Sequence, residues 1–269
     1  MKILRFHRYL LTVFLCIQVN VVYAQPQLKE ALKAFGDCLC ANRNQLEVRD
    51  LRDFYRVRGI PAKCCQALAT NLLPSDITRL VKGIDTSNCR INAMFSPNTP
   101  YDPHNHPLHF VSYVVSGGYT HTIFNKENNV VDNKTDNTHS PCVPNLHQVC
   151  AEHSRIDTKT DTIQKLGTVK LTRSHEESFA KGDLIVYNDT NIIHRPDTNV
   201  ADTLTINFLS DIGDKKIDVF VSHKTPEREK VLSKADTRQP VKKEISSDLI
   251  DKCIMILKSE STKIVGSSR

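Results

Sequence analysis

Five short β-prone runs in the middle of the chain most constrain its fold. They cover residues 110–115, 119–124, 168–172, 183–187 and 203–209 of a sequence of 269 residues. Gly117 and Gly118 separate the first two runs and predict a hairpin turn there. Several short strands with turn residues between them indicate a sandwich or a barrel. We therefore expect a mainly β domain over residues 91–221, with a polar loop inserted at about residues 125–164.

The segments on both sides of this domain are predicted to be helical. Leu28, Leu32 and Phe35 follow the three-and-four spacing of one buried helical stripe. Residues 25–90 are therefore expected to form a compact, cysteine-rich helical prefix. A last amphipathic helix is predicted at residues 246–257, within a charged C-terminal extension over residues 222–269.

Residues 1–24 have the pattern of an export signal. Three basic residues precede an apolar run at residues 10–17, which is shorter than the ~20 residues that span a bilayer. The chain is therefore expected to be secreted or periplasmic, with cleavage before Gln25 and no stable membrane insertion afterwards. An uncleaved membrane anchor is the alternative. Removal of the leader lowers the formal charge from +6 to +3, which argues against nucleic acid as a partner.

Eight of the nine cysteines follow the leader, and an even number in an exported chain favours disulfides over free thiols. The inserted loop carries a second group of possible zinc ligands, namely His139, Cys142, His147, Cys150 and His153. A local Cys142–Cys150 disulfide that fixes this loop is the favoured interpretation.

The most informative segment for function contains His104, Asn105 and His106. Alternate side chains of an extended segment point to the same face, so His104 and His106 can direct two imidazoles toward one point. A third histidine, His194, follows a glycine turn at Gly182 and an apolar strand. Three imidazoles brought together in this way would form a site for a divalent metal ion.

This arrangement resembles the cupin superfamily. In that family a first motif pairs two histidines one residue apart and ends at a glycine, as His104, His106 and Gly117 do here. A second motif runs from a glycine through an apolar strand to a histidine, as from Gly182 to His194. The resemblance covers about half of the chain after the leader. It implies a double-stranded β-helix barrel that carries the helical prefix and the C-terminal helix as additions.

One ligand of the cupin pattern is missing. The glutamate expected after the histidine pair falls on Phe110 or Val111, which leaves three histidines. This set resembles that of thiol dioxygenases and implies Fe(II), although Zn, Ni or Cu also suit imidazole donors. His109 and His121 are predicted as catalytic residues that orient oxygen or substrate, and each is also a possible fourth ligand or a rim residue. Arg195 can pair with a substrate carboxylate, but its position on a strand predicts that it points away from the metal.

Two functions from different classes follow. The favoured one is an Fe(II)-dependent dioxygenase that acts on a small molecule bound beside the metal. The alternative is a non-catalytic secreted binding protein on a cupin scaffold. Oxygenases that use 2-oxoglutarate rank low. They require a carboxylate where this chain has His106, and residues 203–208 lack the basic residue that they usually carry.

Overall fold

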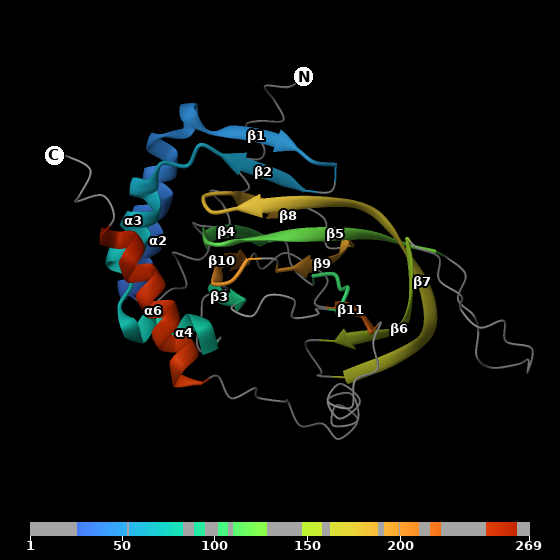
Figure 1. Ribbon diagram of the computed structural model, residues 1–269. Coiled ribbons are helices and arrows are strands. Elements are labelled where there is room, and N and C mark those ends of the chain that lie inside the picture. The colour runs from blue at the N-terminus through green and yellow to red at the C-terminus, as the bar shows by residue number, and fades with distance from the viewer. Residues whose placement is uncertain are drawn as a thin grey trace, which may run out of the picture.

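The computed structural model consists of two antiparallel β-sheets with helices against the outer face of one of them (Figure 1). It describes residues 26–52, 54–82, 89–94, 102–106, 110–127, 147–157, 162–187, 191–198, 200–209, 216–221 and 246–262. This architecture is the mainly β, cupin-like fold that the sequence predicts, with helices near both ends of the described chain.

The first sheet has six strands in the order β1-β2-β8-β4-β10-β3. Their bounds are β1 Glu47–Asp50, β2 Tyr55–Arg58, β8 Leu184–Tyr187, β4 Phe110–Ser116, β10 Thr203–Leu209 and β3 Cys89–Met94. The second sheet has five strands in the order β11-β6-β7-β5-β9. These are β11 Lys216–Val221, β6 Gln148–Asp157, β7 Thr162–Ala180, β5 Gly118–Lys126 and β9 Ile193–Asp197.

Strand β4 shows why the first sheet is buried on both faces. Val111, Tyr113 and Val115 belong to the large hydrophobic cluster that includes the helices, whereas Phe110 and Val114 belong to a separate cluster between the sheets. Because successive side chains of a strand alternate in direction, an almost continuous apolar run fills both layers. The β4 sequence is apolar for this reason.

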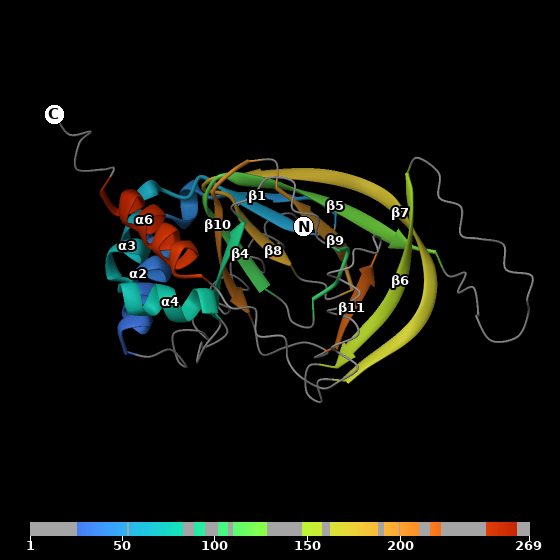
Figure 2. The same cartoon turned by 60° about the horizontal axis from the view of Figure 1, so that its bottom comes forward.

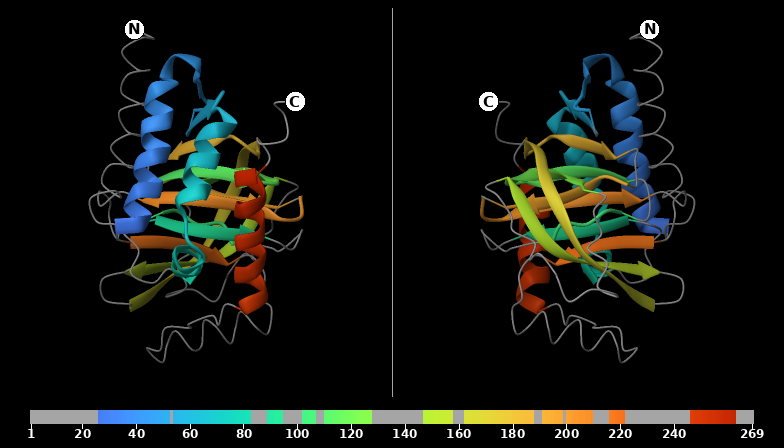
Figure 3. Two further views of the ribbon diagram at one scale, coloured as in Figure 1. Left: turned by 90° about the vertical axis from the view of Figure 1, so that its left-hand side faces the viewer. Right: turned by 90° about the vertical axis from the view of Figure 1, so that its right-hand side faces the viewer.

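The helices pack on the outer face of the first sheet, opposite the second sheet (Figure 2). They are α2 Pro26–Ala41, α3 Ala62–Asn71, α4 Pro74–Lys82 and α6 Ser247–Thr262, with a short 3-10 turn at Arg43–Gln45. Phe35 of α2 is fully buried, and its ring centroid lies 5.2 Å from that of Tyr113 and 5.9 Å from that of Phe208. In Figure 3, α2, α3 and α6 cross the strands. The prefix and the sheet therefore share one core.

The hairpin between β4 and β5 carries the chain from the first sheet to the second. Gly117 has a φ of +67°, and a Cβ atom there would lie 2.4 Å from Thr203 Oγ1. The Thr203 hydroxyl donates a hydrogen bond to the carbonyl of Gly118 and accepts one from its N–H. A glycine is needed at position 117 for both its conformation and this close approach.

Residues 103–106 complete the second sheet by bridging its two edge strands, β9 and β11. His104 exchanges two backbone hydrogen bonds with His194 of β9, of 3.0 and 2.9 Å. On the other side the segment pairs with β11. The N–H of Phe220 in β11 donates to the carbonyl of Pro103, and the N–H of Asn105 donates to the carbonyl of Asp218 in β11. The five strands and this short segment therefore form a closed ring of backbone pairing.

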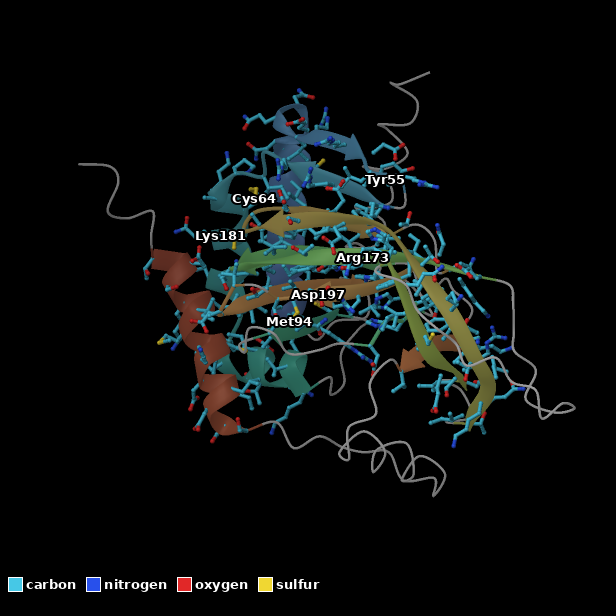
Figure 4. All side chains as sticks on the ribbon, turned by 45° about the vertical axis from the view of Figure 1, so that its right-hand side comes forward. Tyr55, Cys64, Met94, Arg173, Lys181 and Asp197 are labelled. Atoms are coloured by element: carbon cyan, nitrogen blue, oxygen red, sulfur yellow. A yellow bond between two sulfur atoms is a disulfide. The ribbon has the colours of Figure 1, made fainter. Side chains whose placement is uncertain are left out.

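Helix α6 confirms the predicted C-terminal helix, and two ion pairs attach it to the β domain. Lys181, in the turn before β8, pairs with Glu260, and Lys252 pairs with Asp202. Figure 4 shows Lys181 next to this helix. Cys253 and Leu257 bury its apolar side in the shared core.

The prefix differs from the prediction in one respect, because residues 47–58 form the β1–β2 hairpin instead of continuing as helix. Arg56 and Val57 are both buried and Arg58 is exposed, because β2 lies inside the first sheet between β1 and β8. The predicted loop also contains regular structure, since β6 and the start of β7 lie within it. These two strands are consecutive in the chain, and their pairing begins at Asp157 and Thr162. Their side chains are mostly half-buried or exposed, so the sequence shows no clear apolar alternation there.

The cysteines are only partly paired. Cys38 and Cys64 form a disulfide between α2 and α3, and Cys150 is also disulfide-bonded. Cys40, Cys65, Cys89 and Cys253 are free, so the expectation of pairing from the even count is wrong for these four. Three of them are buried in the apolar core, where a thiol packs like a small hydrophobic side chain.

Several predictions concern residues outside the described part of the chain. These are the export signal, Cys142 and residues 222–245 and 263–269 of the charged C-terminal extension. Within the described residues, no helix combines the length and the apolar character needed to cross a membrane.

Phe35 should be critical for stability. We expect Phe35→Ala to lower the free energy of unfolding by about 3–5 kcal/mol, because it opens a cavity between α2 and the first sheet. Urea denaturation followed by circular dichroism measures this loss. Lys33→Ala, at an exposed position of the same helix, is the control and should change stability little. Equal effects of the two substitutions would contradict the shared core.

Candidate metal centre

Three histidines from distant parts of the chain converge between the sheets. His104, His106 and His194 each offer one nitrogen, and these nitrogens all lie within 4.8 Å of one another. The Nε2 atoms of His106 and His194 are 2.7 Å apart. The ring centroids of the three residues are separated by 4.8 to 5.0 Å. The structure thus brings together the three residues that the sequence predicts as metal ligands.

Backbone pairing sets this convergence. His104 and His194 are direct partners, so their side chains extend to the same side of the ring. His106 is two residues further along an extended segment and shares that side, as the alternation predicts. Asn105, between them, points the other way.

Asn105 anchors the two histidines to β11. Its Oδ1 accepts a hydrogen bond of 2.6 Å from the backbone N–H of Asp218, and its own N–H donates to the Asp218 carbonyl. Asp218 is itself held by Arg155 at 2.8 Å and by His153 at 3.0 Å. Burial by itself raises the pKa of Asp218, but the hydrogen bonds from His153 and Arg155 outweigh it and hold this pKa well below its usual range.

The hydrogen bonds of the other ring nitrogens leave suitable lone pairs for a metal. His104 Nδ1 lies 2.8 Å from the carbonyl oxygen of Asp102, which can only accept, so this nitrogen carries the proton. His194 Nδ1 lies 3.0 Å from Nδ1 of His121, on the side away from His106. Such partners fix the tautomer and orientation of a metal-binding histidine.

The site is electrostatically neutral in the absence of a metal. Burial lowers the pKa of His104, His106 and His194, and the neighbouring histidines lower it further for His106 and His194. Because metal ligation requires neutral imidazole, protons compete weakly at this site. Three neutral imidazoles form a donor set that fits Fe(II), Zn, Ni or Cu.

His121 and Tyr187 form a second layer behind His194. His121 is fully buried and its pKa is lowered to about 3, mainly by burial. The Tyr187 hydroxyl lies 2.8 Å from His121 Nδ1, and the Tyr187 ring stacks on Phe110 with centroids 4.0 Å apart. Tyr187 therefore lines the site and is not only a core residue. His121 contacts His194, a predicted ligand, but it does not supply one of the three converging nitrogens.

A cavity of about 580 Å³ opens onto the histidines. Phe110, Met94 and Ile91 supply apolar walls, and Ser112, Thr205 and Asn207 supply neutral polar groups. The size suits a small molecule. Met94 is labelled in Figure 4.

The other residues singled out by sequence have different outcomes. Arg195 forms an ion pair of 2.9 Å with Asp197 and is absent from the described cavity lining, so it points away as predicted. His153 belongs to the Asp218 anchor, and Cys150 is disulfide-bonded. His109, Cys142 and His139 lie outside the described residues. The predicted roles of His109 and His121 and the Cys142–Cys150 pairing stay predictions.

Sequence reasoning missed the anchor and the polar wall. Asn105 looks like a spacer between two histidines, and Asp218 lies 113 residues away in the sequence. Ser112 and Asn207 are ordinary strand residues in the sequence, and only the pairing of β4 with β10 places them opposite each other.

No protein-family model matches the chain, and no curated protein matches it. One solved structure of YcfD from Escherichia coli is similar at 12% identity, with a TM-score of 0.27, over 80% of this chain and 49% of that chain. Another, described as a ribosomal oxygenase in complex with cobalt and 2-oxoglutarate, has 12% identity and a TM-score of 0.26, over 80% and 47%. The chain spans about half the length of these structures.

The two sheets and the histidine triad thus define a cupin-like β protein with a candidate three-histidine metal centre.

The metal-free protein should become less stable as the pH falls below about 6.5. His121 and His194 stay neutral when folded, whereas in the unfolded chain they take up protons near their ordinary pKa of about 6.5. The unfolded state then binds more protons, so each residue lowers the free energy of unfolding by up to about 1.4 kcal/mol per pH unit.

Urea denaturation in the presence of a chelator between pH 7.5 and 4.5 measures this slope. His121→Phe should reduce it, whereas replacement of the exposed His147 by Ala should leave it unchanged. An identical slope for the wild type and His121→Phe would contradict a neutral buried His121.

Asn105 should control metal affinity without being a ligand. We expect Asn105→Ala to weaken Co(II) binding by about tenfold, because the two histidines lose their anchor on β11. Titration with Co(II), monitored by its absorption bands, measures this change. Asn125→Ala, at an exposed position of β5, is the matched control. Affinity within twofold of the wild type would show that Asn105 does not position the site.

Proposed function

We propose that this protein binds one divalent metal ion through His104, His106 and His194 and is a metal-dependent oxygenase that acts on a small molecule. The observation that supports this most directly is the convergence of three neutral imidazole nitrogens within 4.8 Å at a cavity of about 580 Å³. Neutral imidazoles drawn together in a site where His194 is buried and His104 and His106 are half-buried have little reason to converge unless a cation accepts their lone pairs.

Three protein ligands leave coordination positions for exogenous molecules, which is typical of catalytic rather than structural metal sites. When bound, the metal would supply a centre at which dioxygen and the substrate meet. The cavity beside the histidines offers room for the substrate. The resemblance to three-histidine cupins favours Fe(II) among the possible metals.

The surrounding residues have distinct tasks in this proposal. His121 holds His194 in orientation through the contact between their Nδ1 atoms. Burial raises the pKa of Tyr187 well above its usual range, so its hydroxyl keeps its proton and can donate a hydrogen bond beside the site. Phe110 stacks on Tyr187 and packs against His106, which excludes water from this side.

The narrower hypothesis is a dioxygenase. Such an enzyme transfers both atoms of dioxygen to the organic substrate, and the oxidation of that substrate supplies all four electrons. No separate reductant is then required.

A non-catalytic binding protein is the alternative. The described cavity lining contains no carboxylate or lysine that could act as an acid or base, and this favours a binding role. The two functions differ in whether the loaded protein consumes oxygen.

Metal loading tests the proposal. We expect the wild-type protein to bind about one equivalent of Fe(II) or Co(II) under anaerobic conditions, and His194→Ala to bind less than about a tenth as tightly because one of three ligands is lost. His147→Ala, an exposed histidine outside the site, is the matched control and should bind normally.

Oxygen consumption by the Fe(II)-loaded protein with a panel of small thiols then tests the dioxygenase hypothesis. Uptake above the His194→Ala background supports it. A wild type that binds no more metal than His194→Ala would refute the metal site itself, whereas full loading without oxygen uptake on any substrate tried would favour the binding protein.

A further inference from the structure

Asn207 has an unusual position in the cavity. It lies on β10 and lines the same cavity as the histidines, and its side chain is 8% exposed. Its Oδ1 atom is buried and has no hydrogen-bond partner. A buried carbonyl oxygen without a donor costs about 1–3 kcal/mol, so the protein retains an amide here that its own described residues do not satisfy.

The polar groups next to Asn207 lead back to the candidate metal ligands. Ser112 of β4 is the direct strand partner of Asn207. Its hydroxyl bonds to Tyr119, and Tyr119 bonds to Tyr187. Tyr187 contacts His121, which contacts His194. One chain of neutral polar groups therefore runs from the histidine site to the neighbour of Asn207, and the amide at its far end is left unpaired.

Strand geometry gives the distance between the two ends of the cavity. Phe110 packs against His106, with ring centroids 4.3 Å apart. Ser112 is two residues further along β4, and a strand rises about 3.4 Å per residue, so the level of Asn207 is about 7 Å from that of Phe110. A molecule with a small rigid body is therefore long enough to reach from the histidines to Asn207.

The described lining of this cavity carries no Lys, Arg, Asp or Glu. Two charged residues of the β domain outside this lining, Arg195 and Arg58, are paired with Asp197 and Asp183. Arg90, the β3 partner of Asn207, is exposed and is not part of the lining. A charged ligand would lose its hydration here without gaining an ion pair, whereas a neutral polar group would not.

We propose that the cavity binds an uncharged molecule with a compact apolar body and a polar end, such as a carboxamide or a hydroxyl group, that hydrogen-bonds to the amide of Asn207. This inference rests on the proposed function in one respect, because it names the class of ligand for the same site. The apolar body packs against Phe110 and Met94 and directs the other end toward the histidines.

Benzamide and benzoate form a matched pair of probes, because they share size and shape and differ in charge. Saturation-transfer NMR on the metal-free protein with a chelator measures their binding without direct coordination of the carboxylate. We expect benzamide to bind in the millimolar range, at least tenfold more tightly than benzoate. Equal or tighter binding of benzoate, or no saturable binding of benzamide, would overturn the proposal.

Substitution of Asn207 localises the contact. Asn207→Leu, of similar size, should weaken benzamide binding about five- to tenfold because the hydrogen bond is lost. Asn125→Leu, on the exposed part of β5, is the matched control. An effect of Asn207→Leu no larger than that of Asn125→Leu, in a protein with unchanged thermal stability, would overturn the assignment.

Asn207→Asp tests the contact by a gain of binding to a cationic probe, which a loss of structure would not produce. The new carboxylate should increase the affinity for benzamidinium at least fivefold over that of the wild type, and no increase would contradict the assignment. All these measurements use the metal-free chain, so their outcome is separate from the proposed metal function. Failure to load metal would leave the preference for benzamide intact.

Discussion

The backbone pairing of His104 with His194 is the constraint on which the site depends. Two hydrogen bonds join these residues, and further bonds join Pro103 and Asn105 to β11. The segment that carries two candidate ligands is thus itself part of the ring that closes the second sheet. A closed ring fixes the spacing of side chains that extend to one side, so the histidines are placed by the fold and not by a loop. The segment that carries His104 and His106 is therefore part of the β-sheet scaffold.

The sequence predicted the strands and the shared direction of His104 and His106 well because both depend on short-range patterns. Residues 110–115 and 203–209 are dense in β-branched and aromatic side chains, and the observed strands nearly coincide with these ranges. The alternation of His104 and His106 also needs no knowledge of the rest of the chain. His194 required the cupin resemblance, since nothing local links it to residues 88 positions earlier.

What the sequence did not predict depends on pairing between distant segments. Residues 47–58 contain enough helix formers to resemble the helices on either side, and the pairing of β2 with β8 decides in favour of a hairpin. Strand β11 is short and half exposed, and only its contacts with β6 and with residues 103–105 give it a role. The Asn105 anchor and the unpaired Asn207 amide both arise from such pairings.

The distribution of charge connects the fold to its chemistry. Asp218, Arg155 and His153 satisfy one another outside the cavity, at the anchor of the histidine segment, and Arg195 pairs with Asp197. The described cavity walls are uncharged. Electrostatic interactions are stronger in such an interior than in water, so a cation held by the three imidazoles would be its dominant charge. Burial keeps the imidazoles free of protons, and the lack of charge in the described wall disfavours ionic ligands. The proposed metal binding and the proposed ligand class therefore both depend on the absence of competing charge in the described wall.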